Sequence, residues 1–94
     1  YVSPFEVEAT LVQHPAVLEA AVIGVADADG LTRVKAFVVP KPGANPSEEE
    51  LKTFVKDRLA PYKYPRQIEF LPDLPKTATG KIQRFRLRER EAAR

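Results

Sequence analysis

The feature that most constrains this chain is an apolar run over residues 17–25, Val-Leu-Glu-Ala-Ala-Val-Ile-Gly-Val. A run so rich in Val, Ile and Ala favours a β-strand that is largely buried on both faces. Asp27-Ala28-Asp29-Gly30 follows with turn chemistry, since Gly30 can adopt a positive φ. A second apolar strand is expected over residues 33–39, and we therefore predict an antiparallel hairpin.

A helix is predicted before this hairpin. Ser3 can cap its start, Pro4 fits the first helical position, and Glu6 completes a capping box by reaching back to the Ser3 amide. The helix should end near His14, because Pro15 has no amide hydrogen and disfavours helical dihedrals in the residue before it. We expect His14 to cap a carbonyl at this helix end and assign it no catalysis.

A second helix is predicted after the proline-rich loop at residues 40–46. Ser47-Glu48-Glu49-Glu50 repeats the capping-box pattern and places acidic side chains at the positive end of the helix. One helical face then carries four apolar residues, Leu51, Phe54, Val55 and Leu59. This spacing predicts a helix with one buried side.

A strand, a loop and a final helix are predicted for the last third of the chain. Residues 67–71 alternate as a half-buried strand does, and residues 74–81 have the composition of a loop. A charged helix containing Leu is expected from about residue 83 onward. The whole pattern predicts one α+β domain over residues 1–94, with helices packed on a short sheet.

The composition excludes several classes of protein. With 94 residues and 44% hydrophobic content, the chain can bury one modest core. It has no Cys and one His, which excludes a disulfide framework and argues against a structural zinc site. There is no apolar run of the ~20 residues that a membrane helix needs, and no signal-like segment at the N-terminus. We expect a soluble cytoplasmic protein that does not bind a membrane.

The basic residues are concentrated at the C-terminus, where residues 81–94 carry six Arg or Lys against two Glu. Such a tail could contact a nucleotide, an RNA or an acidic protein surface, but a solvated helix face is the more ordinary interpretation. Four of these residues, Arg84, Arg86, Arg88 and Arg90, lack the interleaved aromatic rings of single-strand nucleic-acid binders. We interpret them as surface and interdomain contacts and expect no nucleic-acid partner.

Two motifs, one near each end of the chain, carry a family resemblance. They are Tyr1-Val2-Ser3-Pro4-Phe5-Glu6-Val7-Glu8 and Pro75-Lys76-Thr77-Ala78-Thr79-Gly80-Lys81. The first resembles the segment just after the interdomain hinge, and the second the terminal lysine motif, of the C-terminal domain in the adenylate-forming superfamily. Segments 17–25 and 62–65 also fit, so the resemblance covers nearly the whole chain. Phe5 and the run at residues 79–85 are most similar to AMP-forming CoA ligases of the benzoate type.

The resemblance implies a reaction in two halves. A carboxylic acid, here an aromatic one, reacts with ATP to give an acyl-adenylate and pyrophosphate, and the CoA thiol then displaces AMP. Lys81 is implied as the catalytic residue of the first half, because the family's lysine contacts the carboxylate and phosphate oxygens as they combine. Gly80 would allow close approach to the nucleotide, and Thr79 and Thr77 could bond the loop to itself, although ordinary turn roles explain these three equally well.

The resemblance also implies a CoA-binding segment. Tyr62 could stack on the adenine of CoA, while Lys63 or Arg66 contacts a phosphate. Tyr64 stands where some relatives carry Arg, and a tyrosine-rich corner packed between prolines explains this segment as well as binding does. The main ATP site, the acid pocket and Mg²⁺ are expected in the large N-terminal domain.

That large domain is the implied partner of this chain. In the family, the C-terminal domain rotates about the hinge between the two half-reactions, and the chain resembles the part that starts just after the hinge. An isolated copy should therefore be catalytically inactive. Two alternatives remain open: modification of Lys81 by a protein lysine acetyltransferase, as occurs in related CoA ligases, and a free-standing RNA- or protein-binding module that uses the basic tail.

Overall fold

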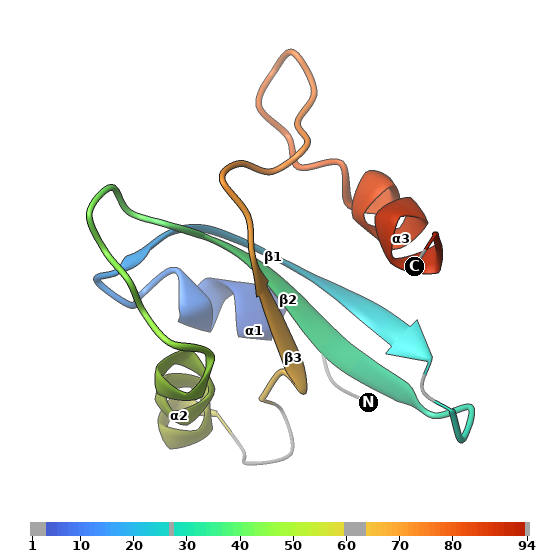
Figure 1. Cartoon of the computed structure of the whole chain (residues 1–94), viewed down its shortest axis with the longest axis horizontal. Coiled ribbons are helices and arrows are strands. Elements are labelled where there is room, and N and C mark those ends of the chain that lie inside the picture. The colour runs from blue at the N-terminus through green and yellow to red at the C-terminus, as the bar shows by residue number, and fades with distance from the viewer. Residues whose placement is uncertain (1–3, 27, 60–63, 94) are drawn as a thin grey trace.

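The computed structural model of this chain describes residues 4–26, 28–59 and 64–93. Over these residues, three helices and three strands form an α+β arrangement, as the sequence predicts (Figure 1). In chain order they are α1 (Pro4–Leu11), β1 (Val17–Ala26), β2 (Thr32–Pro40), α2 (Glu48–Arg58), β3 (Gln67–Phe70) and α3 (Arg84–Ala92).

The sheet has the strand order β1-β2-β3. The predicted hairpin is confirmed: β1 pairs antiparallel with β2, with Val22 opposite Ala36. Gly30 in the connecting turn adopts a φ of 79°, which an L-residue with a side chain rarely takes. β3 lies parallel to β2, with Gln67 opposite Lys35. The short β3 therefore begins beside the start of β2, and both strands run toward the same end of the sheet.

Both faces of the hairpin are covered, which explains why neighbouring residues of β1 are all buried. Successive side chains of a strand point to opposite faces. Ala20 and Val22 join one apolar cluster with residues of α1 and α2, whereas Ala21 and Ile23 join a second cluster with Leu74 and Leu87. Figure 1 shows the corresponding layers, with α1 and α2 on one side of the sheet and α3 on the other.

The first helix ends earlier than predicted, at Leu11 and not near His14. Its last residues turn tightly, and the His14 amide donates to the Leu11 carbonyl at 3.0 Å. The expectation that the His14 side chain caps a carbonyl is wrong. Its Nδ1 accepts a hydrogen bond from the Ala16 amide at 3.0 Å, and its Nε2 lies 3.0 Å from a carboxylate oxygen of Glu50. The predicted Ser3 cap lies outside the described residues.

The second helix begins at the predicted cap. Ser47 Oγ accepts a hydrogen bond from the Glu50 amide at 3.0 Å. The Glu50 carboxylate contacts His14 Nε2, so this side chain links α2 to the end of α1. Leu51 and Val55 are fully buried on the predicted apolar face of α2. The Glu50 amide thus takes part in the helix cap, while the Glu50 carboxylate makes the tertiary contact with His14.

Candidate functional site

The segment that carries the predicted lysine is a hydrogen-bonded loop between β3 and α3. Its two stems pair through an antiparallel bridge between Lys76 and Ile82. The Thr77 amide donates to the Lys81 carbonyl at 2.8 Å, and the Gln83 amide donates to the Pro75 carbonyl at 2.8 Å. In Figure 1 the loop projects beyond the sheet at the top of the view. Its backbone is therefore ordered by its own hydrogen bonds, while its tip extends from the domain.

The tip of the loop is closed by threonine and glycine. Thr77 Oγ1 lies 3.0 Å from Thr79 Oγ1 and accepts a hydrogen bond from the Lys81 amide at 3.1 Å. The Gly80 amide donates to the Thr77 carbonyl at 3.0 Å, and Gly80 has a φ of 89°. The structure thus contains the internal loop bonds that the sequence suggested for Thr77 and Thr79. Gly80 is required by this backbone conformation.

Lys81 itself is exposed at the base of this tip. Among the residues that the structure describes, none forms an ion pair or hydrogen bond with its ammonium group. Its backbone is held on both sides, through the carbonyl to Thr77 and through the amide to the same residue. A lysine whose backbone is held in place and whose ammonium is unpaired can contact the negatively charged oxygens of a molecule outside the domain.

Charged side chains anchor both stems of the loop to the rest of the domain. Lys76 Nζ donates to Glu19 Oε1 of β1 at 2.8 Å and to Asp73 Oδ1 at 3.0 Å. These two hydrogen bonds, with that to Glu19 the larger effect, raise the pKa of Lys76. On the other stem, the guanidinium of Arg84 pairs with Glu8 of α1. Sequence reasoning missed both anchors, because the partners lie 57 and 76 positions apart in the chain.

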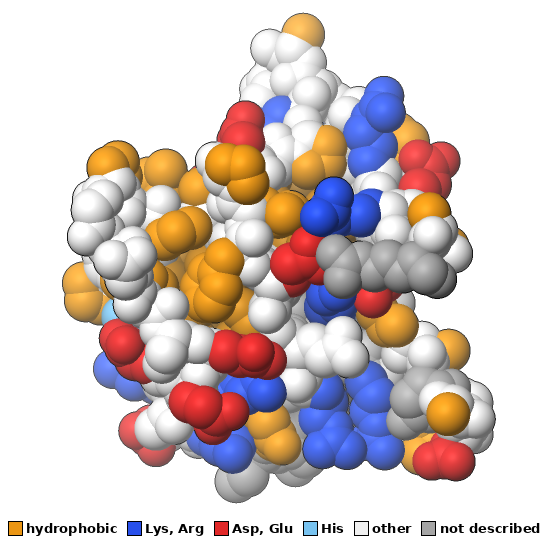
Figure 2. Space-filling view, viewed as in Figure 1, with side chains coloured by type: hydrophobic (Ala, Val, Ile, Leu, Met, Phe, Trp, Pro, Cys, Tyr) orange, Lys and Arg blue, Asp and Glu red, His pale blue; other side chains and the backbone are white. Residues whose placement is uncertain are grey.

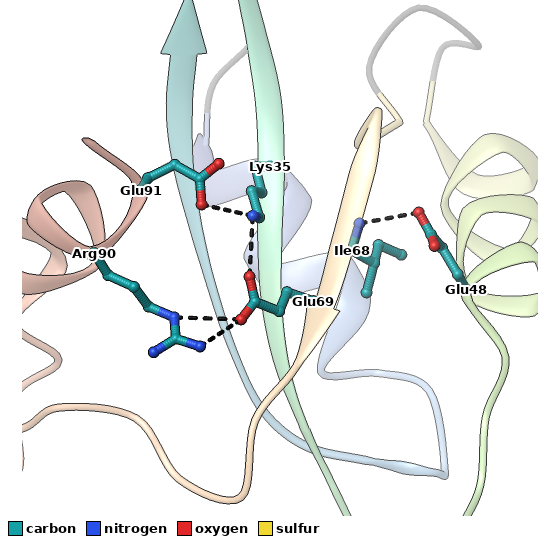
Figure 3. A network of polar contacts seen from close by, with 6 residues as sticks. All are labelled: Lys35, Glu48, Ile68, Glu69, Arg90 and Glu91. Carbon is teal, nitrogen blue, oxygen red and sulfur yellow. Dashed lines mark hydrogen bonds and ion pairs between the residues drawn. The ribbon is translucent and has the colours of Figure 1, made fainter. Parts of the chain in front are cut away.

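A network of four charged residues holds α3 onto the sheet (Figure 3). Lys35 of β2 is 4% exposed, and its ammonium lies 3.0 Å from Glu69 Oε1 of β3 and 2.6 Å from Glu91 Oε1 of α3. Arg90 of α3 donates to Glu69 Oε2 at 2.7 Å. Burial alone would raise the pKa of Glu69, but the hydrogen bonds from Arg90 and Lys35 outweigh it and lower that pKa to about 2.

This network corrects the interpretation of the basic tail. Arg84 and Arg90 were expected to make surface and interdomain contacts, but both are committed to carboxylates of this same domain. Arg86 donates to Gln83 Oε1 at 2.8 Å on the exposed side of α3. Arg84 and Arg90 of α3 therefore tie this helix to α1 and β3, which the local sequence pattern could not reveal.

The segment predicted to bind CoA borders a cavity of about 390 Å³. The cavity lies where β1 ends and where β2 and β3 begin, and its lining residues are Val25, Ala26, Arg33, Val34, Lys35, Lys52, Tyr64, Arg66 and Gln67. Four of these are basic. Figure 2 shows Lys and Arg side chains gathered at the lower edge of the molecule, the end at which β3 begins in Figure 1.

Among the predicted CoA-binding residues, only Arg66 can be placed. It lines the cavity beside Tyr64, and its hydrogen bond to the Tyr64 hydroxyl is the largest cause of a lowered pKa for that phenol. The ammonium of Lys56 lies 4.2 Å from the centre of the Tyr64 ring. Tyr62 and Lys63 lie outside the described residues. Tyr64 packs against the first apolar cluster and also lines the cavity, as Arg66 does.

The lysine loop and the basic cavity occupy opposite ends of the sheet (Figure 1). The cavity is lined by residues at the start of β2 and β3, while the loop follows the end of β3. Arg66 and Lys81 are thus not brought together in one pocket. Two separate candidate contact regions, each basic, are presented by one small domain.

Neither a membrane span nor a metal centre is found in the part of the chain that the structure describes. None of its helices is long and apolar enough to cross a bilayer. Over residues 4–26, 28–59 and 64–93, no three His, Cys, Asp or Glu side chains come together in a group that could hold a metal ion.

Comparison with known proteins shows which proteins this chain is similar to. The chain is 64% identical to a benzoate–CoA ligase of Thauera aromatica over 91 residues, which cover 94% of the chain and 17% of that protein. It is 54% identical to a 4-hydroxybutyrate–CoA ligase of Metallosphaera sedula, covering 96% of the chain and 16% of that protein. The chain thus spans less than a fifth of the length of these relatives.

Solved structures agree with these sequence matches. A benzoate CoA ligase from Burkholderia xenovorans LB400 superposes with a TM-score of 0.83 and 70% identity, covering 94% of the chain and 18% of that structure. An anthranilate CoA ligase in complex with anthranoyl-AMP gives a TM-score of 0.88 and 52% identity, covering 99% and 19%. The family model described as the AMP-binding enzyme C-terminal domain matches residues 6–81, up to and including the candidate lysine. The chain therefore belongs to the family of C-terminal domains of AMP-binding enzymes.

Proposed function

We propose that this chain is the C-terminal domain of an ATP-dependent, AMP-forming carboxylate–CoA ligase, and that Lys81 is its adenylation lysine. The observation that carries the proposal is the geometry of Lys81. Its backbone is fixed by Thr77, and its exposed ammonium has no partner among the described residues. Similarity to CoA ligases over more than nine tenths of the chain supports the reaction class.

The first half-reaction needs a cation where negative charge accumulates. A carboxylate oxygen of the acid attacks the α-phosphorus of ATP, the bond to the bridging oxygen breaks, and pyrophosphate leaves with that electron pair. Lys81 would contact the carboxylate and α-phosphate oxygens as they combine. One such contact at ~4 Å, in an environment of effective dielectric near 20, is worth roughly 4 kcal/mol before the cost of desolvation. Only the part gained in the transition state accelerates the reaction.

The second half-reaction would use the other end of the domain. The CoA sulfur attacks the acyl carbonyl, AMP leaves, and the thiol proton passes to solvent. We propose that the CoA nucleotide binds at the basic cavity, where Arg66 would meet a phosphate of CoA. The separation of this cavity from Lys81 supports a domain that presents one end in each half-reaction. The ATP site, the acid pocket and Mg²⁺ would then lie in the large N-terminal domain.

An aromatic acid, benzoate or a close analogue, is the substrate that we propose. Two relatives named as benzoate ligases share 64% and 70% of the matched residues with this chain. A 4-hydroxybutyrate ligase shares 54%. Because the acid pocket would lie in the larger domain, the proposal for the acid rests on similarity, whereas the proposal for Lys81 also rests on geometry.

The test is acid-dependent exchange between ATP and pyrophosphate in the full-length enzyme that carries this domain. Wild type, Lys81→Ala and Lys41→Ala would be compared with benzoate and a panel of aliphatic acids. By analogy with loss of an oxyanion donor, Lys81→Ala should slow exchange about 10²–10³-fold or more. Thioester formation from supplied acyl-adenylate should persist. Lys41 is exposed at the end of β2 and serves as the control.

The outcomes separate the two parts of the proposal. Equal loss of both half-reactions in Lys81→Ala would overturn the role of Lys81. Exchange that is faster with an aliphatic acid than with benzoate would overturn the proposed substrate and leave the ligase class intact. If Lys81→Ala exchanges ATP and pyrophosphate at the wild-type rate, only the chain's membership of the family remains supported.

The exposed ammonium also supports a second candidate function for the same residue. We propose that a protein lysine acetyltransferase can modify Lys81, which would remove the charge that adenylation needs. Peptide mass spectrometry after incubation with such an enzyme and acetyl-CoA should locate the added acetyl group on Lys81. Acetylation at Lys41 to the same extent would indicate unselective modification of exposed lysines.

A further inference from the structure

One carboxylate joins three elements of the domain next to the lysine loop. Glu8 lies on α1, and its Oε2 accepts hydrogen bonds from the Val22 amide of β1 and from Arg84 Nε, both at 2.8 Å. Its Oε1 accepts from the second nitrogen of the same guanidinium. Because Arg84 is the first residue of α3, this bidentate pair fixes the point at which the chain leaves the loop.

A second carboxylate holds the other stem. Glu19 of β1 accepts a hydrogen bond from Lys76 Nζ at 2.8 Å, and Lys76 begins the bridged part of the loop opposite Ile82. The side chains of Glu19 and Lys76 are each 27% exposed, so water screens this pair in part. Arg84 is similarly exposed at 28%, but its partner Glu8 is only 12% exposed. The Glu8 pair is therefore the better shielded anchor.

The ion pairs of the two stems and the hydrogen bonds within the loop stabilise different features of the loop. Backbone bonds between Thr77, Gly80 and Lys81 shape the tip, and the Pro75–Gln83 hydrogen bond closes its base. None of these bonds reaches another element of the fold. The ion pairs of Lys76 and Arg84 do reach β1 and α1. Together with the apolar packing of Leu74 and Ile82 in the second cluster, they orient an already shaped loop relative to the sheet.

We propose that Glu8 and Glu19 are positioning residues for Lys81 in adenylation. This inference rests on the proposed function of Lys81. Loss of either carboxylate leaves the loop closed on itself but less firmly oriented relative to the sheet. The ammonium of Lys81 then reaches the reacting oxygens in fewer productive geometries. The basic cavity lies at the other end of the sheet, so thioester formation should be spared.

The experiment uses the full-length enzyme with Glu8→Gln and Glu19→Gln. Glutamine keeps an oxygen that can accept from the Val22 amide, but its NH₂ group faces a guanidinium nitrogen, which cannot accept a hydrogen bond. Misplacement by about 1 Å can cost up to 10²-fold in rate, and we expect Glu8→Gln to slow ATP–pyrophosphate exchange by roughly 10- to 100-fold. Glu19→Gln, at the more exposed pair, should have a smaller effect in the same direction.

Two comparisons separate positioning from general weakening of the domain. Leu11→Ala removes buried apolar volume from the core, belongs to neither the loop stems nor the cavity lining, and should change the two half-reactions by equal factors. A double-mutant cycle of Glu8→Gln and Arg84→Gln should be strongly non-additive, because each change breaks the same pair. A selective loss of exchange with this coupling supports the proposal.

The results that would overturn the positioning role differ from those that would overturn the proposed function. Equal losses in exchange and in thioester formation by both glutamine variants, or wild-type exchange in both, would overturn the positioning role. Lys81→Ala belongs in the same series. If Lys81→Ala loses exchange while both glutamine variants retain it, only the positioning inference fails. If Lys81→Ala retains exchange, the proposed function itself fails.

Discussion

Lys35 of β2 donates a hydrogen bond to Glu91 of α3 at 2.6 Å, across 56 positions of the chain. The same ammonium contacts Glu69 of β3, so one buried lysine connects two strands and the C-terminal helix. Lys35 is 5% exposed as a side chain, and its two partners are 18% and 16% exposed. The two carboxylates offset the cost of burying the Lys35 ammonium.

Replacing Lys35 should therefore be strongly destabilising. Lys35→Met keeps the aliphatic volume but leaves Glu69 and Glu91 close together without their shared cation. We expect a loss of about 3 kcal/mol in the free energy of unfolding of the 94-residue chain, near the lower end for a broken buried pair because both acids retain some exposure. Urea titration at pH 7 measures it. The exposed control Lys41→Met should stay within about 0.5 kcal/mol of wild type.

Glu69 predicts part of the acid sensitivity of the fold. Its pKa in the folded chain is lowered to about 2, below the value of the unfolded chain, so its contribution to stability is complete above the unfolded pKa. That contribution is lost as the pH falls through the unfolded pKa toward about 2. Glu69→Gln should cost on the order of 2 kcal/mol at pH 7, after allowance for partial exposure, and much less at pH 3.

The measurement for Glu69 is the unfolding free energy of wild type and variant between pH 7 and pH 3. Other carboxylates also titrate in this range, so the difference between the two proteins carries the information. Glu49→Gln at the exposed start of α2 is the control for removal of one surface carboxylate. A pH-independent difference for Glu69→Gln would contradict the prediction.

Two glycines allow local strain to be separated from a role at the site. Gly80 and Gly43 both have a positive φ, at 89° and 80°, and a Cβ at either position would meet no atom within 4 Å. Substitution by alanine should therefore destabilise both by about 1 kcal/mol, through the backbone alone. Only Gly80→Ala should also slow ATP–pyrophosphate exchange in the full-length enzyme. Equal exchange rates in the two variants would count against a role for the shape of the loop.

Arg66 offers a test of the basic cavity. Arg66→Ala should raise the KM for CoA about tenfold, the value of one charge-assisted hydrogen bond of about 1.5 kcal/mol. ATP–pyrophosphate exchange should remain near wild type, because Arg66 and Lys81 lie at opposite ends of the sheet. Steady-state kinetics with CoA as the varied substrate measures the effect, with Lys41→Ala as control. An unchanged KM would favour a purely structural role beside Tyr64.

Local structure was predicted well where its cause is local. The hairpin follows from a continuous apolar run with a turn that requires a positive φ at Gly30, and the start of α2 follows from the Ser47 cap. The end of α1 was predicted too late, because Pro15 marks only where a helix can no longer continue. The role predicted for His14 was wrong for a different reason, because its partner Glu50 lies on another helix.

The sequence by itself determined the α+β order of elements, the family resemblance and the candidate Lys81, because caps, prolines, apolar periodicity and the glycine–lysine motif all act within a few positions. Only the tertiary structure decided which of the 13 acidic residues meet Lys35, Lys76 and Arg84. It also decided that β3 lies parallel to β2, which puts the basic cavity and the lysine loop at opposite ends of the sheet. These contacts join residues far apart in the chain, where burial and packing of whole elements select the partner and no local rule applies.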